Sequence, residues 1–157
     1  MAKPNILCID DQREVLATIK KDVQAFEPIV TIHDCESASE AEDLLNDLAN
    51  EGEQVAVIIC DHIMPGENGV DFLIRTSKDK RFVHTKKMLL TGLATHRDTI
   101  QAINEAQVDY YIEKPWDEDE FSGAVKRLLT QYVVDAGMDY SEMADYLDQE
   151  TLAIKNE

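Results

Sequence analysis

Acidic, hydroxyl and amino side chains stand at or just after the ends of four apolar segments of this chain. Asp10 and Asp11 follow NILCI, Asp61 follows VAVIIC, Thr91 closes MLLT, and Lys114 lies just beyond a fourth segment. Clustered carboxylates repel one another, and a hard divalent cation such as Mg²⁺ removes that repulsion. A hydroxyl and an ammonium beside them would bind phosphoryl oxygens, with Asp61 as the nucleophile. The chemistry that these residue types favour together is phosphoryl transfer.

Apolar segments that alternate with amphipathic segments predict the elements that position these side chains. Strands are expected over residues 5–9, 29–33, 55–60, 88–91 and 110–112. Amphipathic helices are expected between them, one over residues 95–106, and the last begins near Asp117. This alternation specifies a parallel sheet with helices on both faces, and right-handed crossovers make it doubly wound. The ligand site of such a sheet lies at the carboxyl ends of its strands.

Local signals mark several helix boundaries. Ser37 with Glu40 three positions later predicts a capping box, and Asn68 is placed to cap the helix that follows it. Gly52 is expected to end the preceding helix. Gly69 is expected to allow a close approach of the chain at the start of the helix after Asp61.

Four segments resemble the receiver domain of two-component response regulators, over roughly residues 4–134. They are ILCIDD from Ile6, IICDHIMPGENG from Ile58, LLTG from Leu89 and YYIEKPW from Tyr110. The resemblance implies a flavodoxin-like (CheY-like) α/β fold, a doubly wound five-stranded parallel sheet with helices on both faces. We expect a receiver domain over residues 1–136 and a C-terminal extension, helical at least in part, over residues 137–157.

The resemblance also implies the roles of the site residues. Asp61 would accept a phosphoryl group from a histidine kinase or a histidine phosphotransfer protein. Mg²⁺, or Mn²⁺ in its place, would be bound directly by Asp11, Asp61 and the backbone carbonyl of Ile63, and mostly through water by Asp10. Lys114 would contact the phosphoryl group, and its peptide bond to the following proline would be cis.

Two further pairs of residues surround the implied site. Thr91 would move toward a phosphoryl oxygen on activation, and Tyr111 would be the coupled aromatic side chain that turns inward. Ile63 and Leu93 stand two positions after Asp61 and Thr91, where water must approach the phosphoryl group. Their branched apolar side chains would hinder that water and offer it no hydrogen bond, which predicts a long-lived phosphoryl group. The alternative is that both side chains pack away from the site.

The same residues argue against two other functions that this fold allows. A flavodoxin-type flavin carrier needs Ser, Thr and Gly in its first loop, where this chain has Asp10 and Asp11. A haloacid-dehalogenase-type phosphatase needs a D-x-D pattern there, which DDQRE lacks. A protein-interaction module that works without phosphorylation remains the alternative function. Beyond its own phosphorylation and dephosphorylation, the chain is not expected to act on a small-molecule substrate.

Composition restricts partners and location. The formal net charge of −17 over 157 residues argues against direct nucleic-acid binding by this chain, because phosphates would be repelled. No apolar run reaches the roughly 20 residues that span a bilayer, and MAKPNILCIDD lacks the apolar region of a signal peptide. We therefore expect a cytoplasmic chain without a membrane partner. Cys8, Cys35 and Cys60 lack the spacing of a disulfide framework or a zinc site and are expected to be small packed residues.

Two features leave alternatives open. Trp116 either packs on the core beneath the last helix of the domain or faces a partner. The extension carries an apolar stripe of Tyr140, Met143, Ala144, Leu147 and Ile154. It is a sixth helix that packs back on the domain, a helix that forms a homodimer, a frayed acidic tail, or the start of a linker to an output domain.

Overall fold

The structure is a computed structural model, and it describes residues 3–92, 100–101 and 104–155. Five strands form one sheet, and its helices are α1, α2, α3, α5 and α6. The strands are β1 (Asn5–Ile9), β2 (Thr31–Cys35), β3 (Val55–Asp61), β4 (Lys86–Thr91) and β5 (Tyr110–Glu113). The helices are α1 (Arg13–Val23), α2 (Ala38–Asn50), α3 (Gly69–Ser77), α5 (Glu118–Asp135) and α6 (Gln149–Lys155). Short 3₁₀ helices cover Gln24–Phe26, Lys80–Phe82 and Ala144–Tyr146.

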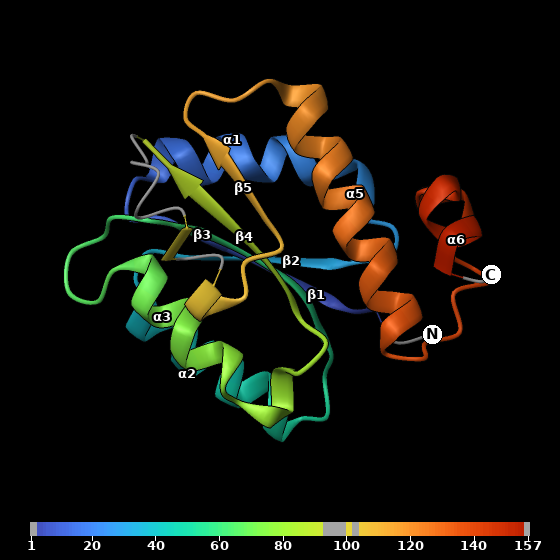
Figure 1. Cartoon of the computed structure of the whole chain (residues 1–157), viewed down its shortest axis with the longest axis horizontal. Coiled ribbons are helices and arrows are strands. Elements are labelled where there is room, and N and C mark those ends of the chain that lie inside the picture. The colour runs from blue at the N-terminus through green and yellow to red at the C-terminus, as the bar shows by residue number, and fades with distance from the viewer. Residues whose placement is uncertain (1–2, 93–99, 102–103, 156–157) are drawn as a thin grey trace.

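All strand pairs are parallel, in the order β2-β1-β3-β4-β5. Figure 1 shows α1 and α5 on one face of the sheet and α2 and α3 on the other. The central strands β1 and β3 are buried throughout, because helices cover both of their faces. The predicted fold class, a doubly wound five-stranded parallel sheet, is confirmed.

Two cores stabilise these layers. One lies between the sheet and α1 with α5, and it includes Ile19, Phe121 and Leu129. The other lies between the sheet and α2 with α3, and it includes Leu45 and Phe72. No helix among the described residues is long and apolar enough to cross a membrane.

The boundaries of four strands differ from the predicted ones. β3 extends by one residue, to Asp61. β2 begins at Thr31 rather than at Ile29, because the carbonyl of Phe26 accepts hydrogen bonds from the amides of Ile29 and Val30, both at 2.9 Å. These two residues close a turn and bury their side chains instead of pairing with β1. β4 begins two residues early, at Lys86, because its two lysines pair with β3 although they lack the apolar character expected of a buried strand. β5 extends by one residue, to Glu113.

The predicted helix caps are present, with one change. Ser37 Oγ accepts a hydrogen bond from the amide of Glu40 at 3.1 Å, and Asn68 caps α3 in the same way. The Glu40 carboxylate, however, bonds the amide of Glu36 at 2.9 Å rather than that of Ser37. Most of the helix predicted over residues 95–106 lies outside the described residues. Within that range, the structure describes residues 100–101 and 104–106, and these are helical.

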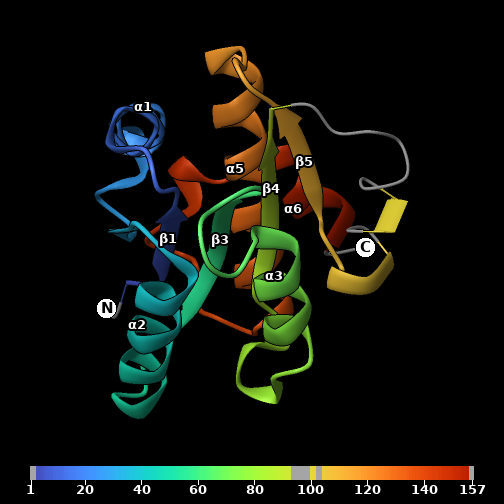
Figure 2. The same ribbon diagram turned by 90° about the vertical axis from the view of Figure 1, so that its left-hand side faces the viewer.

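The C-terminal extension packs back on the domain. Met143, Leu147 and Leu152 are buried and belong to the core formed by the sheet with α1 and α5. Figure 1 shows α6 beside α5, on the side away from β5, and Figure 2 shows the same arrangement from another direction. The apolar stripe was predicted only in part, since Ile154 is exposed and Leu152 takes its place in the core. The reason is that the segment is not one continuous helix but a 3₁₀ turn followed by α6.

The three cysteines are free and buried, as predicted. Burial raises the pKa of Cys8 and of Cys35 to about 12. Burial also raises the pKa of Cys60, and the nearby Asp61 adds to that effect. Neutral thiols of this kind are packing residues rather than nucleophiles.

Candidate functional site

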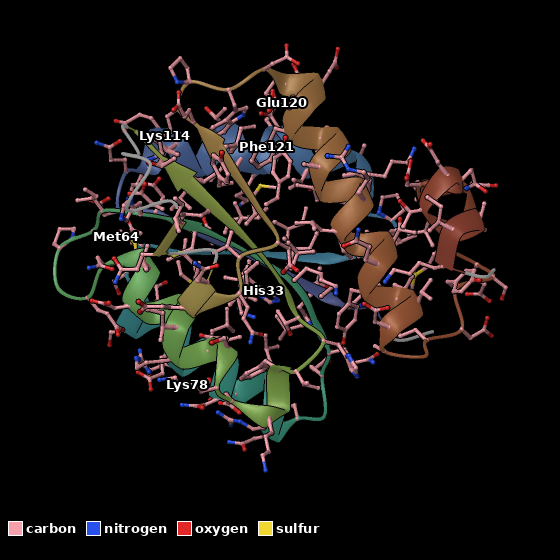
Figure 3. All side chains as sticks on the ribbon, viewed as in Figure 1. His33, Met64, Lys78, Lys114, Glu120 and Phe121 are labelled. Atoms are coloured by element: carbon pink, nitrogen blue, oxygen red, sulfur yellow. The ribbon has the colours of Figure 1, made fainter. Side chains whose placement is uncertain are left out.

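The predicted site residues meet at one edge of the sheet. Asp10 follows β1, Asp61 ends β3, Thr91 ends β4 and Lys114 follows β5, so parallel strands bring them together. Figure 3 labels Lys114 at this edge, beyond the end of β5. A cavity of about 540 Å³ opens here. It is lined by Asp11, Gln12, Asp61, His62, Ile63, Thr91, Gly92 and Lys114.

Three carboxylates lie close together at this edge. One oxygen each of Asp10, Asp11 and Asp61 lies within 4.8 Å of the others. Asp10 and Asp61 are buried, whereas Asp11 is exposed. An all-oxygen set at this spacing, with one acid open to solvent, fits a hard divalent cation that keeps part of its water. These residues are therefore suited to hold Mg²⁺.

The two oxygens of Asp10 are already engaged by the protein. Oδ1 accepts a hydrogen bond from the amide of Gln12 at 2.9 Å, and Oδ2 lies 2.8 Å from Lys114 Nζ. Asp11 has no such bonds among the described residues. The direct contact of Asp11 with a cation and the contact of Asp10 through water stay predictions.

Lys114 connects the acids. Its ammonium lies 2.8 Å from Asp10 Oδ2 and 2.8 Å from Asp61 Oδ1. Burial works to lower the pKa of Lys114, but the bonds to Asp10 and Asp61 outweigh it and raise that pKa. The side chain therefore stays protonated. Its peptide bond to Pro115 is cis, as the resemblance implies.

Asp61 combines burial with nearby charge. Burial raises the pKa of its carboxyl group, the neighbouring Asp10 and Asp11 add to that effect, and Lys114 opposes it. The surroundings of Asp61 thus destabilise its charged form, and a bound cation would reduce that destabilisation.

Thr91 presents an unused hydroxyl. The residue is 1% exposed, and within the described part of the chain its Oγ1 is the buried side-chain oxygen that has no hydrogen-bond partner. A buried hydroxyl without a partner is rare. It is a donor available to a ligand oxygen in the cavity.

The loop after Asp61 is held close to the strand by Gly69. Its amide donates to the carbonyl of His62 at 2.7 Å. A Cβ added at Gly69 would lie 1.8 Å from the carbonyl oxygen of Asp61, so no other residue fits without displacing the backbone there. The predicted close approach at this position is confirmed.

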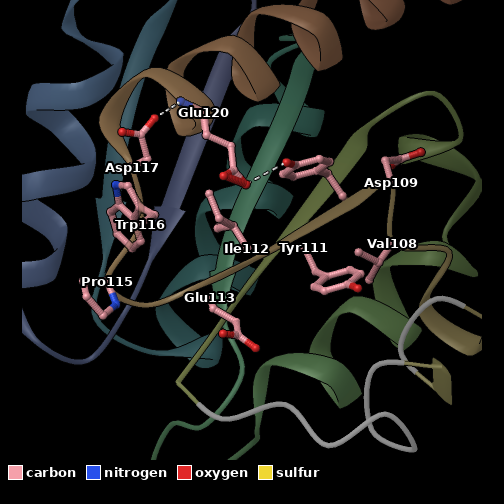
Figure 4. A pocket seen from close by; sticks show the side chains of 10 residues that line it. Val108, Asp109, Tyr111, Ile112, Glu113, Pro115, Trp116, Asp117 and Glu120 are labelled. Carbon is pink, nitrogen blue, oxygen red and sulfur yellow. Dashed lines mark hydrogen bonds between the residues drawn. The ribbon is translucent and has the colours of Figure 1, made fainter.

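The rim and switch residues are only partly described. Ile63 lines the cavity and is 75% exposed. Leu93 lies outside the described residues. Tyr111 is 44% exposed on β5, and Figure 4 shows it on the opposite side of the strand from Ile112. The roles of Thr91 and Tyr111 as a switch, and of the Ile63 carbonyl as a metal ligand, stay predictions.

Two contacts near the site were not predicted. The amide of Gln12 holds Asp10, and the signal for it is local, because an Asp side chain often bonds the amide two residues ahead. The indole Nε1 of Trp116 donates to Asp22 Oδ2 at 2.8 Å. The spacing of these residues does not predict that bond, because Asp22 lies in α1, 94 positions earlier.

Comparison with known proteins identifies the family. The profile of the response regulator receiver domain matches residues 6–126. The hydrogenase transcriptional regulatory protein HoxA of Bradyrhizobium diazoefficiens is 32% identical over 127 residues, which are 81% of this chain and 24% of HoxA. The response regulator Rre1 of Synechocystis sp. is 30% identical over an alignment of 163 residues, covering all of this chain and 66% of Rre1.

A solved structure agrees with these relatives. The signal receiver domain of an HD domain-containing protein from Pseudomonas fluorescens Pf-5 superposes with a TM-score of 0.75 at 26% identity, over 87% of this chain and 94% of that one. The chain spans about a quarter of the length of HoxA and about two thirds of Rre1. With its profile match, its relatives and its fold in agreement, this chain belongs to the response regulator receiver domain family.

Proposed function

We propose that Asp61 accepts a phosphoryl group from the phosphohistidine of a histidine kinase or histidine phosphotransfer protein. The observation that carries this proposal is the arrangement around Asp61. Lys114 lies 2.8 Å from its carboxylate, and the unpartnered hydroxyl of Thr91 lines the same cavity. An acid, an ammonium and a free hydroxyl around one space match the needs of a transferring phosphoryl group.

In the proposed reaction, a carboxylate oxygen of Asp61 forms a bond to phosphorus as the phosphorus–nitrogen bond of the donor breaks. The donor imidazole leaves with the electron pair of that bond and takes up a proton. Lys114 binds a phosphoryl oxygen and stabilises the charge that builds on it. Hydrolysis of the acyl phosphate returns Asp61 to its carboxylate form.

Receiver domains generally bind Mg²⁺ at an acidic pocket, and this chain has such a cluster of aspartates. We assign direct contacts to Asp11, Asp61 and the carbonyl of Ile63, and a contact through water to Asp10. A bound Mg²⁺, or Mn²⁺, supplies positive charge that offsets the repulsion between the carboxylates and the phosphoryl group. Phosphorylation is therefore expected to require one of these ions.

The output follows from a change of conformation. Thr91 is proposed to move toward a phosphoryl oxygen, with Tyr111 turning inward, so that the receiver alters its contact with a partner or an output domain. Receiver domains interact with histidine kinases and output domains. HoxA is described as a transcriptional regulatory protein. With a net charge of −17, this chain would influence transcription through such a partner or output domain rather than by touching DNA itself.

The extension over residues 137–157 is proposed to be an added part of the receiver domain of residues 1–136. The burial of Met143, Leu147 and Leu152 supports a packed extension rather than a free linker. Formation of a homodimer stays a prediction.

The alternative function is an interaction module that works without phosphorylation. The 2.8 Å pair of Asp61 and Lys114, with the Asp11 carboxylate nearby, favours the phosphorylated receiver, because a docking module has no need of a buried acid and its ammonium partner. One experiment separates the two functions.

The experiment incubates the chain with acetyl phosphate or phosphoramidate and Mg²⁺ and measures the intact mass. We expect the gain of one phosphoryl group, labile to hydroxylamine, which disappears when Mg²⁺ is chelated and in Asp61→Ala. Asp43→Asn, which changes an exposed acid of α2, is the matched control and should keep the gain. A wild-type chain that gains no mass would support the module without phosphorylation.

A further inference from the structure

The segment after β5 is attached to two helices through one side chain, Trp116. Its indole Nε1 donates to Asp22 Oδ2 of α1 at 2.8 Å. Its ring stacks on Phe121 of α5, with centroids 4.8 Å apart and an angle of 20° between the planes. Phe121 is completely buried, so it provides a fixed surface. Figure 4 shows Trp116 in the connection between Pro115 and Asp117, where α5 begins.

The same segment carries Lys114. The amide of Lys114 donates to the carbonyl of Thr91 at 2.8 Å, which fixes the backbone to the end of β4. Pro115, whose ring restricts rotation about its own N–Cα bond, is the one residue between Lys114 and Trp116. The segment is thus held at one end by β4 and at the other by the indole. Both attachments restrict where the ammonium of Lys114 can lie.

Asp22 makes the indole attachment specific. It is 8% exposed, and the hydrogen bond from Trp116 is the one that the described residues provide to its side chain. A buried carboxylate that loses its donor is strongly disfavoured, so the pair resists separation. A ring without an N–H would keep the stack on Phe121 and lose this bond.

We propose that Trp116 and Asp22 are positioning residues for Lys114 in the phosphorylation of Asp61. The hydrogen bond between them holds the 114–116 segment against α1, which keeps the Lys114 ammonium within reach of Asp61 and Asp10. This inference rests on the proposed function of Asp61. It adds to the site two residues that do not line its cavity.

Simple packing predicts a different behaviour. If Trp116 only covers Phe121, then Trp116→Phe keeps an aromatic stack and phosphorylates normally. If the hydrogen bond positions Lys114, the same variant loses rate, because displacement of a catalytic group by about 1 Å costs up to about a hundred-fold. The rate of phosphorylation therefore separates positioning from packing.

The test measures the rate constant of Asp61 phosphorylation by acetyl phosphate at saturating Mg²⁺. We expect Trp116→Phe and Asp22→Ala each to lower it roughly three- to ten-fold, a smaller loss than that limit because Lys114 keeps its backbone bond. Asp22→Asn keeps an acceptor oxygen and is expected to retain most of the rate. The double variant Trp116→Phe with Asp22→Ala should be no slower than either single variant, because both remove the same bond.

A matched control and a second readout protect the result. Tyr110→Phe removes the 3.1 Å hydrogen bond from Tyr110 to Glu120 at the start of α5. This bond does not involve Lys114, so the variant should keep the wild-type rate of phosphorylation. Trp116 is the single tryptophan of the chain, so its fluorescence reports directly on its surroundings. Its emission should shift in Asp22→Ala and in Lys114→Ala and stay unchanged in Tyr110→Phe.

The outcomes are distinct. Folded Trp116→Phe and Asp22→Ala variants that phosphorylate at the wild-type rate would overturn the positioning role and leave the proposed function intact. A wild-type chain that takes no phosphoryl group would overturn both. If Trp116→Phe does not fold, the pair of Asp22→Ala and Asp22→Asn decides from the other side of the bond.

Discussion

The ammonium of Lys114 lies 2.8 Å from Asp61 Oδ1 and at the same distance from Asp10 Oδ2, so one cation joins two buried acids. That single positive charge does not balance the site, because Asp11 stands beside it as a third acid. The raised pKa of Asp61, caused mainly by burial and increased by Asp10 and Asp11, is the consequence. The charged form of Asp61 therefore destabilises the fold, and a cation bound by the three carboxylates would reduce that effect.

The first prediction concerns the effect of the Asp61 charge on the stability of the fold. Because the pKa of Asp61 is raised above its usual 3.8, stability conferred by its neutral form is present below pH 3.8 and is lost as pH rises through the raised pKa. Without Mg²⁺, Asp61→Asn is expected to be more stable than wild type at pH 7, by about 1 kcal/mol or roughly 2–4 °C in the melting temperature. The gain should shrink toward pH 3, as measured by thermal denaturation.

Asp43→Asn is the control for this measurement, since the exposed Asp43 should change stability by less than about 0.5 kcal/mol at any pH. A gain for Asp61→Asn that is the same at pH 7 and pH 3 would show that the charge of Asp61 does not strain the fold.

The second prediction concerns Gly69. A Cβ at this position would lie 1.8 Å from the carbonyl oxygen of Asp61, so Gly69→Ala must displace the backbone that carries the phosphoacceptor. We expect a loss of about 1–3 kcal/mol, as for other overpacked sites, in denaturant unfolding.

Gly123→Ala in α5 is the matched control, because its Cβ would meet only a side-chain atom of Arg127, at 3.7 Å. That change is expected to stabilise the chain by about 1 kcal/mol through helix propensity. Equal effects of the two substitutions would contradict the close approach at Gly69.

Much of the site was predictable because each residue stands at or near a strand end. Parallel strands separated by helices bring their carboxyl ends to one edge, so Asp10, Asp61, Thr91 and Lys114 needed only the correct strand assignment. That assignment did not need precise boundaries: β4 begins two residues earlier than predicted and β5 ends one residue later, yet Thr91 and Lys114 still lie at the predicted edge.

The bond between Trp116 and Asp22 was beyond such reasoning. Asp22 interrupts the buried side of α1, where apolar periodicity would place an apolar residue. Whether a buried acid finds a donor depends on which distant side chain packs there, and only tertiary structure decides that. The same holds for the extension, where a turn between Met143 and Leu147 broke the expected apolar stripe.

The third prediction concerns the lifetime of the phosphoryl group. Ile63 lines the cavity and is 75% exposed, so it stands where water approaches without offering a hydrogen bond. Ile63→Asn is expected to speed the loss of the phosphoryl group roughly five-fold, since one hydrogen bond contributes about 1 kcal/mol. The decay of phosphorylated chain after removal of the donor measures this rate, and adding Leu93→Glu should increase it further.

Val83→Asn is the control, because Val83 is 71% exposed and does not line the cavity. It should leave the decay unchanged. An unchanged decay in Ile63→Asn would mean that its side chain does not shield the acyl phosphate.

The last prediction distinguishes a packed extension from a loose one. Leu147 is 1% exposed in the core beside α5, and the amide of the next residue, Asp148, donates to Thr130 Oγ1 at 2.9 Å. Leu147→Ala is expected to cost about 2–5 kcal/mol in denaturant unfolding, as for other buried leucines. Ile154→Ala, at a position 64% exposed on α6, should cost less than about 0.5 kcal/mol. Small and equal effects would mean that the extension is a tail or linker, whereas the expected contrast makes it part of the folded receiver.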